Sequence, residues 1–478
     1  MFLRQLFDPS LAQYSYLVGC QKTGEACIID PERDARRYLE LAEENDLRIC
    51  AVAETHIHAD FVSGSQELVA LVPDLRLYLS GEGGPDWTYQ WSRAMKNVHL
   101  LRHGQTFKIG KIQIEAVHTP RHTPEHLSFL MTDLGGGVDE PIAIVTGDFL
   151  FVGDVGRTDL LESAAGARGV MEPSARDLQR SLAERLTALA DYVQVLPAHG
   201  AGSACGKSLG AVPVSTLGYE RRHNQPFKTA LSQAEQFVRE ILAGQPEPPP
   251  YFARMKQVNR DGIAVTGGPA VPRQMTPEEA AKAVGDGARA LDTRVDAEAF
   301  DAAHLPKAIH APLGTKFFPV AAGSYVEADD PIVLIVTRQS EVERAVLELY
   351  RIGFDQITGW LTVQEIADAG LATGTIPRMP FEQFNEARAR ETGVIIDVRT
   401  ASEFAGGHID GAWSFPYTRL KTRLEDLPTG KRLHVYCGSG NRAALAASYL
   451  QAQGHEVLHV DGVCQQCESI ALAEGVLH

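Results

Sequence analysis

A short stretch near the start of the chain carries side chains with the types and spacing of metal ligands. His56, His58 and Asp60 stand at every second position, shortly after the apolar run 49–53. Imidazole and carboxylate groups are common ligands of zinc and of iron in proteins. The next residue is Phe61, and a phenyl ring has no atom that binds a metal. The motif therefore predicts a metal site and, at its end, a missing ligand.

A glycine-containing loop in the C-terminal part carries a cysteine in a setting that favours the thiolate. The apolar segment 433–436 is followed by Cys437, then by the loop residues Gly438, Ser439, Gly440 and Asn441, then by Arg442 and an alanine-rich helix expected over 443–451. Backbone N–H groups and the positive end of a helix both stabilise a thiolate. The same loop can cradle a transferred sulfane sulfur or an oxyanion. We therefore predict a nucleophile at Cys437 rather than a small buried apolar residue.

Length, charge and cysteine usage restrict the class of protein. The 478 residues exceed one ordinary domain, and the 44% hydrophobic and 22% charged residues are typical of a globular protein. The formal net charge of −16 argues against nucleic acid and anionic membranes as partners. We expect no membrane span and no signal peptide, because neither pattern is found. Seven scattered cysteines fit a reducing compartment, so we expect a cytoplasmic protein.

Short strands are expected to position the candidate ligands in the first 230 residues. The apolar segments that predict them are 26–30, 49–54, 112–117, 142–146 and 192–196. His56, His122, Asp148 and His199 each follow a strand, and strand ends in layered α/β proteins bring distant residues together. Residues 245–250 read QPEPPP, which predicts a linker or an extended strap.

Beyond this strap the sequence repeats itself. Residues 291–294 (LDTR) recur as 396–399 (IDVR), His304 recurs as His408, Pro312 as Pro416, and the strand 332–336 as 433–436. The register holds over several elements, so we predict two α/β copies of roughly 100 residues each. Where the second copy has the Cys437 loop, the first reads VTRQSE at 336–341, with neither cysteine nor glycine.

The metal motif has companions in TPRHT (119–123), TGD (146–148) and PAHG (197–200), and in this order they resemble the metallo-β-lactamase superfamily. GRTD at 156–159 is similar to its glyoxalase II and persulfide dioxygenase branch. The resemblance implies an αββα sandwich and one metal held by His56, His122 and Asp148, because glyoxalase II needs another ligand where Phe61 stands. Two imidazoles and a carboxylate with open positions are typical of non-heme Fe(II) oxygenases, and zinc accepts the same donors. His58, Asp60 and His199 are then expected to orient these ligands or to contact the substrate.

The Cys437 loop, together with Asp397, Glu403 and His408 upstream, resembles the rhodanese sulfurtransferases. This resemblance implies that Cys437 carries sulfur as a persulfide and that Arg442 closes the loop and attracts an anionic donor such as thiosulfate. Four residues separate the cysteine from the arginine, whereas related phosphatases have five and a larger loop. Sulfur transfer is therefore the better fit, and the first copy is expected to be an inactive rhodanese fold.

The whole chain resembles persulfide dioxygenase–rhodanese fusion proteins with one inactive and one active rhodanese domain. The expected fold is α/β multidomain, with an αββα sandwich at 1–245, a linker at 246–261, an inactive rhodanese-like domain at 262–375 and an active one at 376–478. The expected function is sulfide detoxification. O₂ would oxidise a low-molecular-weight thiol persulfide, of glutathione, coenzyme A or a similar thiol, to sulfite and thiol at one Fe²⁺ per chain. Cys437 would perform thiosulfate chemistry, and we expect a homo-oligomer.

Two other functions remain open from the sequence. One is a zinc thioester hydrolase, like glyoxalase II, with a rhodanese attached. The other is a non-catalytic persulfide sensor or sulfur carrier with a vestigial metal site.

Other cysteines give weaker predictions. Cys205, beside Gly206 and Lys207, and Cys20, in an expected turn, are candidates for further reactive thiols. Cys464 and Cys467 have the C-x-x-C spacing, but two more zinc ligands are missing, so a packing role is expected.

Overall fold

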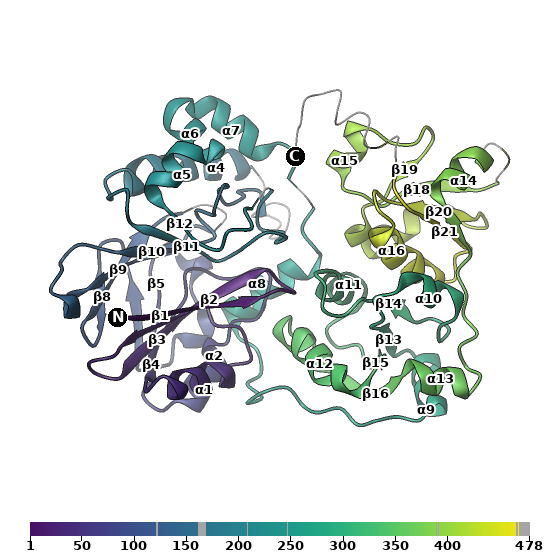
Figure 1. The fold of residues 1–478 in the computed structure, drawn as a ribbon, viewed down its shortest axis with the longest axis horizontal. Coiled ribbons are helices and arrows are strands. Elements are labelled where there is room, and N and C mark those ends of the chain that lie inside the picture. The colour runs from purple at the N-terminus through teal and green to yellow at the C-terminus, as the bar shows by residue number, and fades with distance from the viewer. Residues whose placement is uncertain are drawn as a thin grey trace. The chain divides into compact units, whose positions relative to one another are not determined.

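The computed structural model describes residues 1–120, 123–160, 169–207, 209–245, 247–388, 390, 392–464 and 467. The chain divides into two compact units, Met1–Pro269 and Ala270–His478, which Figure 1 draws as ribbons. The border between the units lies beyond the proline-rich segment. The predicted linker 246–261 is wrong over its second part, where helix α8 (Tyr251–Asp261) belongs to the first unit. This part is ordered because Phe252 and Met255 are buried.

Two six-stranded sheets form the centre of the first unit. The orders are β1-β2-β3-β4-β5-β6 and β12-β11-β10-β9-β8-β7. The strands are β1 (Phe2–Asp8), β2 (Gln13–Cys20), β3 (Glu25–Ile29), β4 (Arg48–Ala53), β5 (Arg76–Ser80), β6 (Val98–Leu101), β7 (Thr106–Ile109), β8 (Ile112–His118), β9 (Leu127–Asp133), β10 (Ala143–Gly147), β11 (Gln194–Pro197) and β12 (Ser215–Thr216). The five predicted strands are confirmed as β3, β4, β8, β10 and β11, with bounds that shift by up to two residues.

Helices cover the outer faces of both sheets. They are α1 (Arg36–Glu44), α2 (Ser65–Leu71), α4 (Met171–Ser181), α5 (Leu217–His223), α6 (Gln225–Ser232) and α7 (Ala234–Leu242). Alternate strand residues point to opposite faces. Ile29 and Val145 therefore pack between the sheets, whereas their neighbours Ile28 and Ile144 pack with the helices. The unit is thus the predicted αββα sandwich.

The second unit contains two parallel sheets of matching topology. Their orders are β14-β13-β15-β16 and β17-β21-β20-β18-β19, so the second repeats the first once β17 is set aside. The strands are β13 (Arg289–Asp292), β14 (Ile309–His310), β15 (Ile332–Val336), β16 (Ile357–Thr362), β17 (Arg378–Pro380), β18 (Val394–Asp397), β19 (Trp413–Ser414), β20 (Leu433–Tyr436) and β21 (Val457–Asp461). The helices are α9 (Pro277–Gly285), α10 (Ala297–Ala302), α11 (Phe317–Tyr325), α12 (Val342–Arg351), α13 (Val363–Asp368), α14 (Phe381–Ala387), α15 (Ala401–Gly406) and α16 (Asn441–Ala452).

Strand pairing in these sheets fixes which residues of the two copies correspond. Ile335 pairs with Asp292 in the first copy, and Tyr436 pairs with Asp397 in the second. Ile335 is followed by Val336, and Tyr436 is followed by Cys437, so Val336 corresponds to Cys437. The border between the copies near residue 376 stays a prediction, because both copies lie in one compact unit.

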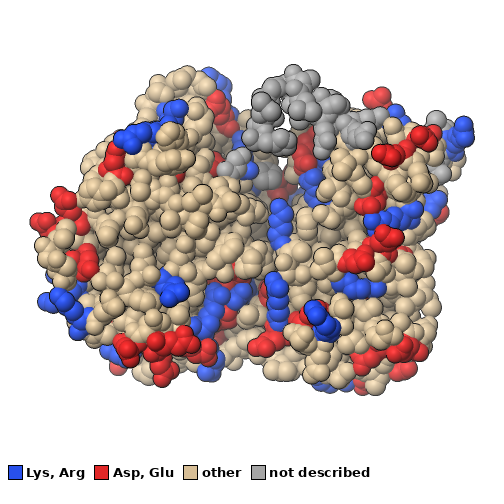
Figure 2. Space-filling model, viewed as in Figure 1, with Lys and Arg blue, Asp and Glu red and all other residues tan. Residues whose placement is uncertain are grey.

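Charged side chains are spread over the surface. On the face drawn in Figure 2, Lys and Arg of the described residues are interspersed with Asp and Glu. Within the part of the chain that the structure describes, no helix has both the length and the apolar character needed to cross a membrane.

Candidate metal centre and sulfur-carrying loop

The loop after β4 fixes the orientation of His56. The backbone N–H of Thr55 donates to Oδ1 of Asp30 at 2.7 Å, and the Thr55 hydroxyl donates to Oδ2 of Asp30 at 2.8 Å. The same hydroxyl lies 2.9 Å from Nδ1 of His56. Since its only proton goes to Asp30, the hydroxyl accepts from an Nδ1–H group. The lone pair of the neutral His56 ring is therefore on Nε2, the nitrogen that can bind a metal.

A histidine that the sequence interpretation missed positions Asp148. The backbone N–H of Asp148 donates to Nε2 of His126 at 3.2 Å, and Nδ1 of His126 lies 2.9 Å from the hydroxyl of Thr119. Gly147 precedes Asp148 with a φ of 50°. A Cβ at Gly147 would lie 2.5 Å from Nε2 of His126 and 2.8 Å from the hydroxyl oxygen of Thr55. Only glycine therefore lets the Asp148 loop approach the two elements that hold it.

Four of the predicted residues converge in the interior. Nε2 of His56 lies 3.9 Å from Oδ2 of Asp148, and Nε2 of His199 lies 3.2 Å from Oδ1 of Asp148 and 3.3 Å from Oδ2 of Asp60. Nδ1 of His199 donates to the carbonyl oxygen of Ala12 at 3.1 Å, which turns its Nε2 toward the carboxylates. All four side chains are buried. His122, the remaining predicted ligand, lies outside the described residues.

His58 directs one nitrogen toward a separate acidic pair. Its Nε2 lies 3.2 Å from Oδ1 of Asp30 and 3.1 Å from Oε2 of Glu54. The other oxygen of Glu54 accepts hydrogen bonds from the hydroxyls of Ser63 and Ser65. Burial lowers the pKa of His58, but the two carboxylates more than compensate and raise it well above the ordinary value. Asp30 and Glu54, which the sequence interpretation missed, thus fix this ring.

The convergent donors fit a bound cation. Two ligand atoms that each lie about 2.1 Å from one ion are at most about 4.2 Å apart, and the 3.9 Å between His56 Nε2 and Asp148 Oδ2 is within this limit. Nε2 of His199 and Oδ2 of Asp60 are buried and lie 3.3 Å apart, but outside hydrogen-bond geometry, and Nδ1 of His58 is buried and makes no hydrogen bond with the described residues. Buried polar atoms in this condition are costly unless a ligand satisfies them.

Helix α8 holds the loop that carries the end of the metal motif. The side-chain amide of Asn259 donates to the carbonyl oxygens of His58 at 2.9 Å and Phe61 at 2.7 Å, and its oxygen accepts from the backbone N–H of Ser63 at 2.8 Å. Phe61 is fully buried, with its ring centroid 4.4 Å from that of His58. The segment predicted as a linker therefore shapes the site.

Cys205 lies next to the convergent residues. Its sulfur and the ligand atoms of Asp60 and His199 all lie within 4.8 Å of one another, so these three residues could also hold a cation. Arg157 forms a bidentate ion pair with Asp159 and donates to the carbonyl oxygen of Ala204 at 2.8 Å, which fixes the loop. Burial, and then the nearby charge of Asp148, raises the pKa of Cys205 to about 11. Without a cation nearby, the group is a thiol near neutral pH.

Cys20 has the opposite electrostatic setting at the end of β2. The backbone N–H of Lys111 donates to its sulfur at 3.2 Å. Burial raises the pKa of Cys20, but the Thr23 hydroxyl and the N–H groups of Lys111, Thr23 and Lys22 together lower it below the ordinary value. Of the two candidate thiols, Cys20 therefore has the more stabilised thiolate.

The second copy forms the predicted strand, loop and helix around Cys437. The cysteine follows β20, is buried, and accepts a hydrogen bond at 3.1 Å from the backbone N–H of Gly440. Gly440 has a φ of 88°, and α16 begins at the next residue. Gly438 and Ser439 complete the loop between the strand and the helix, whereas Asn441, predicted as a loop residue, is the first residue of α16.

Arg442 is already engaged in an ion pair. Its Nη1 and Nη2 donate to the two carboxylate oxygens of Glu403 at 2.6 Å and 2.8 Å. Glu403 also accepts from the backbone N–H and the hydroxyl of Thr400, which cap the start of α15. Burial opposes ionisation of Glu403, but Arg442 and Thr400 lower its pKa to about 2. The charge of Arg442 is therefore partly neutralised within the chain.

The loop of the first copy ends in a carboxylate at the corresponding position. Oε2 of Glu341 accepts from the backbone N–H groups of Thr337 at 3.0 Å and Arg338 at 3.3 Å. Its other oxygen accepts from the Arg338 side chain. The N–H groups of this loop thus bind an anion that belongs to the chain.

Cys464 and Cys467 pack against a hydrophobic cluster of the second copy, as predicted, and they also form a disulfide, which the sequence interpretation missed. The backbone N–H of Cys467 donates to the carbonyl oxygen of Cys464 at 2.9 Å, and this turn places the two Cα atoms 5.3 Å apart. The N–H of Cys464 also donates to the carbonyl oxygen of Gly438 at 3.3 Å, which links the turn to the Cys437 loop.

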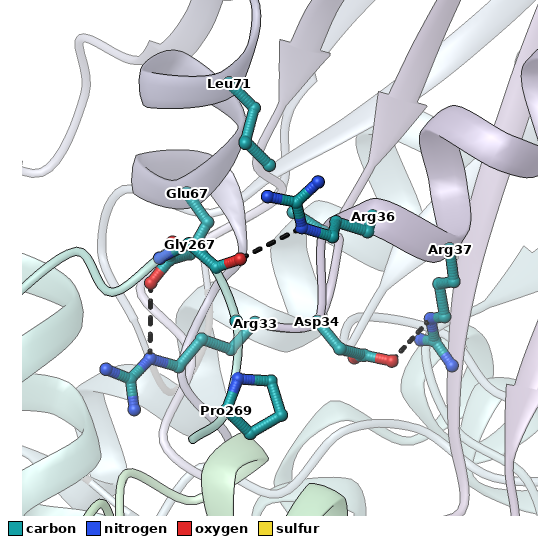
Figure 3. A pocket seen from close by; sticks show the side chains of 10 residues that line it. Arg33, Asp34, Arg36, Arg37, Glu67, Leu71, Gly267 and Pro269 are labelled. Carbon is teal, nitrogen blue, oxygen red and sulfur yellow. Dashed lines mark hydrogen bonds and ion pairs between the residues drawn. The ribbon is translucent and has the colours of Figure 1, made fainter. Parts of the chain in front are cut away.

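A small pocket of about 110 Å³ in the first unit is shown in Figure 3. Three arginines line it, and each has a partner within the chain. Arg36 donates to the carbonyl oxygen of Gly267 at 3.1 Å, Arg37 lies 3.2 Å from Asp34, and Arg33 lies 3.8 Å from Glu67. The arginines that line the pocket are therefore already engaged within the chain, and the pocket differs in kind from the metal centre.

Comparisons with known proteins match the two parts of the chain that contain these residues. The metallo-beta-lactamase superfamily matches residues 9–199, and the rhodanese-like domain matches residues 381–467. A metallo-beta-lactamase of Staphylococcus aureus subsp. aureus COL, known from its crystal structure, is 38% identical, with a TM-score of 0.66. The similarity covers 76% of this chain and 99% of that one.

Two curated relatives match the first unit. The mitochondrial persulfide dioxygenase ETHE1 of Bos taurus is 29% identical over 242 residues, which is 50% of this chain and 80% of the relative. The cytoplasmic hydroxyacylglutathione hydrolase of Arabidopsis thaliana is 33% identical over 186 residues, which is 39% of this chain and 63% of the relative. With the αββα sandwich and its convergent ligands in place, the chain belongs to the metallo-beta-lactamase superfamily and carries a rhodanese-like domain in its C-terminal part.

Proposed function

We propose that the first unit oxidises a low-molecular-weight thiol persulfide with O₂, and that Cys437 in the second unit carries sulfane sulfur. In the balanced reaction the persulfide, O₂ and water give the thiol, sulfite and protons, and O₂ takes up all the electrons that the sulfane sulfur loses. The persulfide dioxygenase relative and the rhodanese-like domain support a role in sulfur metabolism. Sulfide detoxification is the setting that we propose for it.

The observation that carries the first half of this proposal is the side chain after Asp60. Phe61 is fully buried and fills the position where a two-metal hydrolase of this kind has a histidine. A phenyl ring cannot bind a metal, which favours one ion over two. The ligands that we propose for it are His56, His122 and Asp148.

Fe²⁺ is the proposed ion. Two imidazoles and a carboxylate would leave positions open for O₂ and for a sulfur ligand, and bound Fe²⁺ supplies the redox chemistry that oxygenation needs. Zinc accepts the same donors but does not change oxidation state.

The residues of the chain hold the donors and exclude water. Thr55 keeps the lone pair of His56 on Nε2, and His126 fixes the backbone of Asp148. Asn259 fixes the loop between His58 and Ser63. The convergent groups are nearly inaccessible to solvent, so their electrostatic interactions with a bound cation are strong.

Sulfur transfer at Cys437 is the second half of the proposal. A thiosulfate dianion would give its outer sulfur to the Cys437 thiolate, the sulfur–sulfur bond of thiosulfate would break, and sulfite would leave. The persulfide on Cys437 would then pass this sulfur to a thiol acceptor such as glutathione. The reverse direction would combine the bound sulfur with sulfite to form thiosulfate.

Metal content and oxygen uptake test the oxygenase half. We expect one iron per chain after anaerobic purification, and O₂ consumption with glutathione persulfide that is lost in His122→Ala and Asp148→Ala. The Cys437→Ser variant should retain O₂ uptake with this small substrate. Two metals per chain, or loss of O₂ uptake in Cys437→Ser, would contradict an independent one-iron site.

Thioester hydrolysis is the second candidate, favoured by the similarity to the hydroxyacylglutathione hydrolase. It predicts stoichiometric zinc, no O₂ consumption and rapid cleavage of lactoylglutathione. That result would replace the oxygenase proposal.

A further inference from the structure

A buried histidine connects the two copies of the second unit at the Cys437 loop. His459 lies on β21 and is fully buried. Its Nδ1 lies 2.7 Å from Oδ2 of Asp301, which belongs to α10 of the first copy. Its Nε2 lies 3.3 Å from the carbonyl oxygen of Gly440. Both neighbours are acceptors, so the ring donates in both directions and joins the carboxylate of one copy to the loop of the other.

Gly440 is the loop residue that contacts the sulfur. Its N–H donates to Sγ of Cys437, while its carbonyl oxygen accepts from His459. Glycine has more backbone conformational freedom than any other residue. An external hydrogen bond on this carbonyl therefore limits rotation of the residue whose N–H must point at the sulfur.

A second route leads from Asp301 to the other side of Gly440. Nη1 of Arg378 lies 3.6 Å from Oδ2 of Asp301, and Nη2 of Arg378 donates to Asp461 at 2.5 Å. Asp461 packs so closely on Gly440 that an added Cβ there would overlap Oδ1 of Asp461. Asp301, which is only 3% exposed, is thus connected to both sides of the loop residue.

We propose that Asp301 and His459 are positioning residues for sulfur transfer at Cys437. The first copy, which has no cysteine in its own loop, would supply the carboxylate that holds the active loop in shape. Hydrogen-bond donors fixed in advance around a sulfur anion stabilise it better than donors that must reorganise. The inference rests on the proposed role of Cys437 as the sulfur carrier.

A matched pair of variants at residue 459 separates the two hydrogen bonds. The amide of His459→Gln can reach the place of Nε2 and still donate to Gly440, whereas that of His459→Asn takes the place of Nδ1 and can donate only to Asp301. For transfer from thiosulfate to cyanide, we expect kcat to fall about tenfold in His459→Asn and less than threefold in His459→Gln, with KM for thiosulfate nearly unchanged. Equal losses in the two variants would overturn the proposal.

The effect of replacing Asp301 is compared with the effect of removing another contact between the two copies, one that does not reach the Cys437 loop. Oε1 of Gln451 lies 2.9 Å from Nε2 of His304, and Gln451→Ala removes this contact. We expect Asp301→Ala to lower kcat about tenfold, Asp301→Asn to stay within about threefold because its amide oxygen still accepts, and Gln451→Ala to leave kcat unchanged. If Asp301→Ala and Gln451→Ala lower kcat alike, the contact serves only stability. If Asp301→Ala does not fold, the comparison of His459→Asn with His459→Gln tests the positioning role.

A measurement that does not depend on sulfur transfer distinguishes failure of this inference from failure of the proposed function. The rate of Cys437 alkylation by iodoacetamide at pH 7, followed by mass spectrometry of the full-length chain, depends on how well the sulfur anion is held. We expect a several-fold slower reaction in His459→Asn than in His459→Gln. Absence of transfer in the unmodified protein, with this difference preserved, would reject the sulfurtransferase proposal and keep the positioning role. Equal alkylation rates would reject the positioning role.

Discussion

The loops that follow β15 and β20 start at the same register and end in opposite charges. Val336, the last residue of β15, corresponds in register to Cys437, and Glu341 and Arg442 stand at the loop ends. In the first loop, the Glu341 carboxylate accepts from two backbone N–H groups. In the second, a loop N–H donates to the sulfur of Cys437.

In terms of the proposed function, the two loops share a fold, but only the second offers a nucleophilic sulfur. A ring of N–H groups attracts an anion, and the first copy satisfies its own groups with a side chain. The second copy leaves the place for a sulfur anion. The absence of a cysteine at Val336 is therefore only half of the difference, because Glu341 also accepts from two N–H groups of the first loop.

Removal of the sulfur from the second loop should have the largest effect. We expect Cys437→Ser to lower kcat/KM for sulfur transfer from thiosulfate by roughly a thousandfold or more, because a hydroxyl replaces the thiolate nucleophile. Transfer to cyanide, measured as thiocyanate, checks this. The matched control is the double variant Val336→Cys with Cys437→Ser, which should stay inactive because Glu341 fills the first loop. Recovery of activity in the double variant would show that the two loops differ only by the cysteine.

The charge at the end of the active loop should have the next largest effect. We expect Arg442→Ala to lower kcat/KM for thiosulfate by about ten- to a hundredfold, because the Glu403 carboxylate then faces the anionic donor without its partner. Steady-state kinetics over a range of thiosulfate concentrations measure it.

Glu403 offers a control for this prediction. The double variant Arg442→Ala with Glu403→Ala should recover part of the loss, since it removes the repulsive charge. A double variant that is no better than the single one would show that Arg442 acts by closing the loop and not through charge.

The carboxylate of the first loop should affect stability and leave transfer unchanged. Glu341→Ala removes the acceptor of two backbone N–H groups, which should lower the free energy of unfolding by about 1 kcal/mol. Urea denaturation followed by circular dichroism measures the change. Glu343→Ala, an exposed position on α12, is the control and should stay within about 0.5 kcal/mol of the original. A drop in sulfur transfer in Glu341→Ala would contradict the separation of the two loops.

The smallest expected effect is a pH dependence of the second loop. The pKa of Glu403 is about 2 in the folded chain and about 4.3 when unfolded. A lowered folded pKa gives stability that is fully present above about pH 4.3 and is lost as the pH falls toward 2. We expect Glu403→Gln to be less stable than the original by on the order of 1 kcal/mol near pH 6, because solvent screens this partly exposed pair.

Denaturation curves at several pH values test this prediction. The difference between Glu403→Gln and the original should narrow steadily below about pH 4. A difference that is constant down to pH 3 would mean that the charge of Glu403 does not stabilise the loop.

Local patterns in the sequence were sufficient to predict five strands of the first unit, and they indicated the convergence of His56, Asp148 and His199. The reason is that each of these three residues lies within a few residues of the end of an apolar strand, and strand ends meet at one edge of the sandwich. The cysteine loop is equally local, because strand, glycine turn and helix are contiguous in the sequence.

The supporting contacts could not be predicted in the same way. His126 holds Asp148, and Asp30 holds Thr55, through contacts that depend on how separate loops pack. Asp30 does end an apolar strand, which is the one signal that might have identified it. The hydrogen bond between His459 and Asp301 joins residues 158 positions apart and has no counterpart in spacing or periodicity.

The proline-rich segment misled the interpretation because it does not separate two folded parts. The described residues of this segment, 245 and 247–250, lack a regular strand or helix, but α8 follows them at once and belongs to the first unit. Its Asn259 was missed because an isolated asparagine in a polar helix has no distinguishing pattern.

The contact between Asn259 and Phe61 also sets an order of events during protein synthesis. The two residues are 198 positions apart, and the ribosome adds about 5 to 20 residues per second. For about 10 to 40 seconds after Phe61 is made, the growing chain therefore carries the metal motif without the amide that fastens its loop. A nascent chain interrupted before α8 would contain every proposed metal ligand, yet the loop between His58 and Ser63 would lack its hydrogen bonds to Asn259.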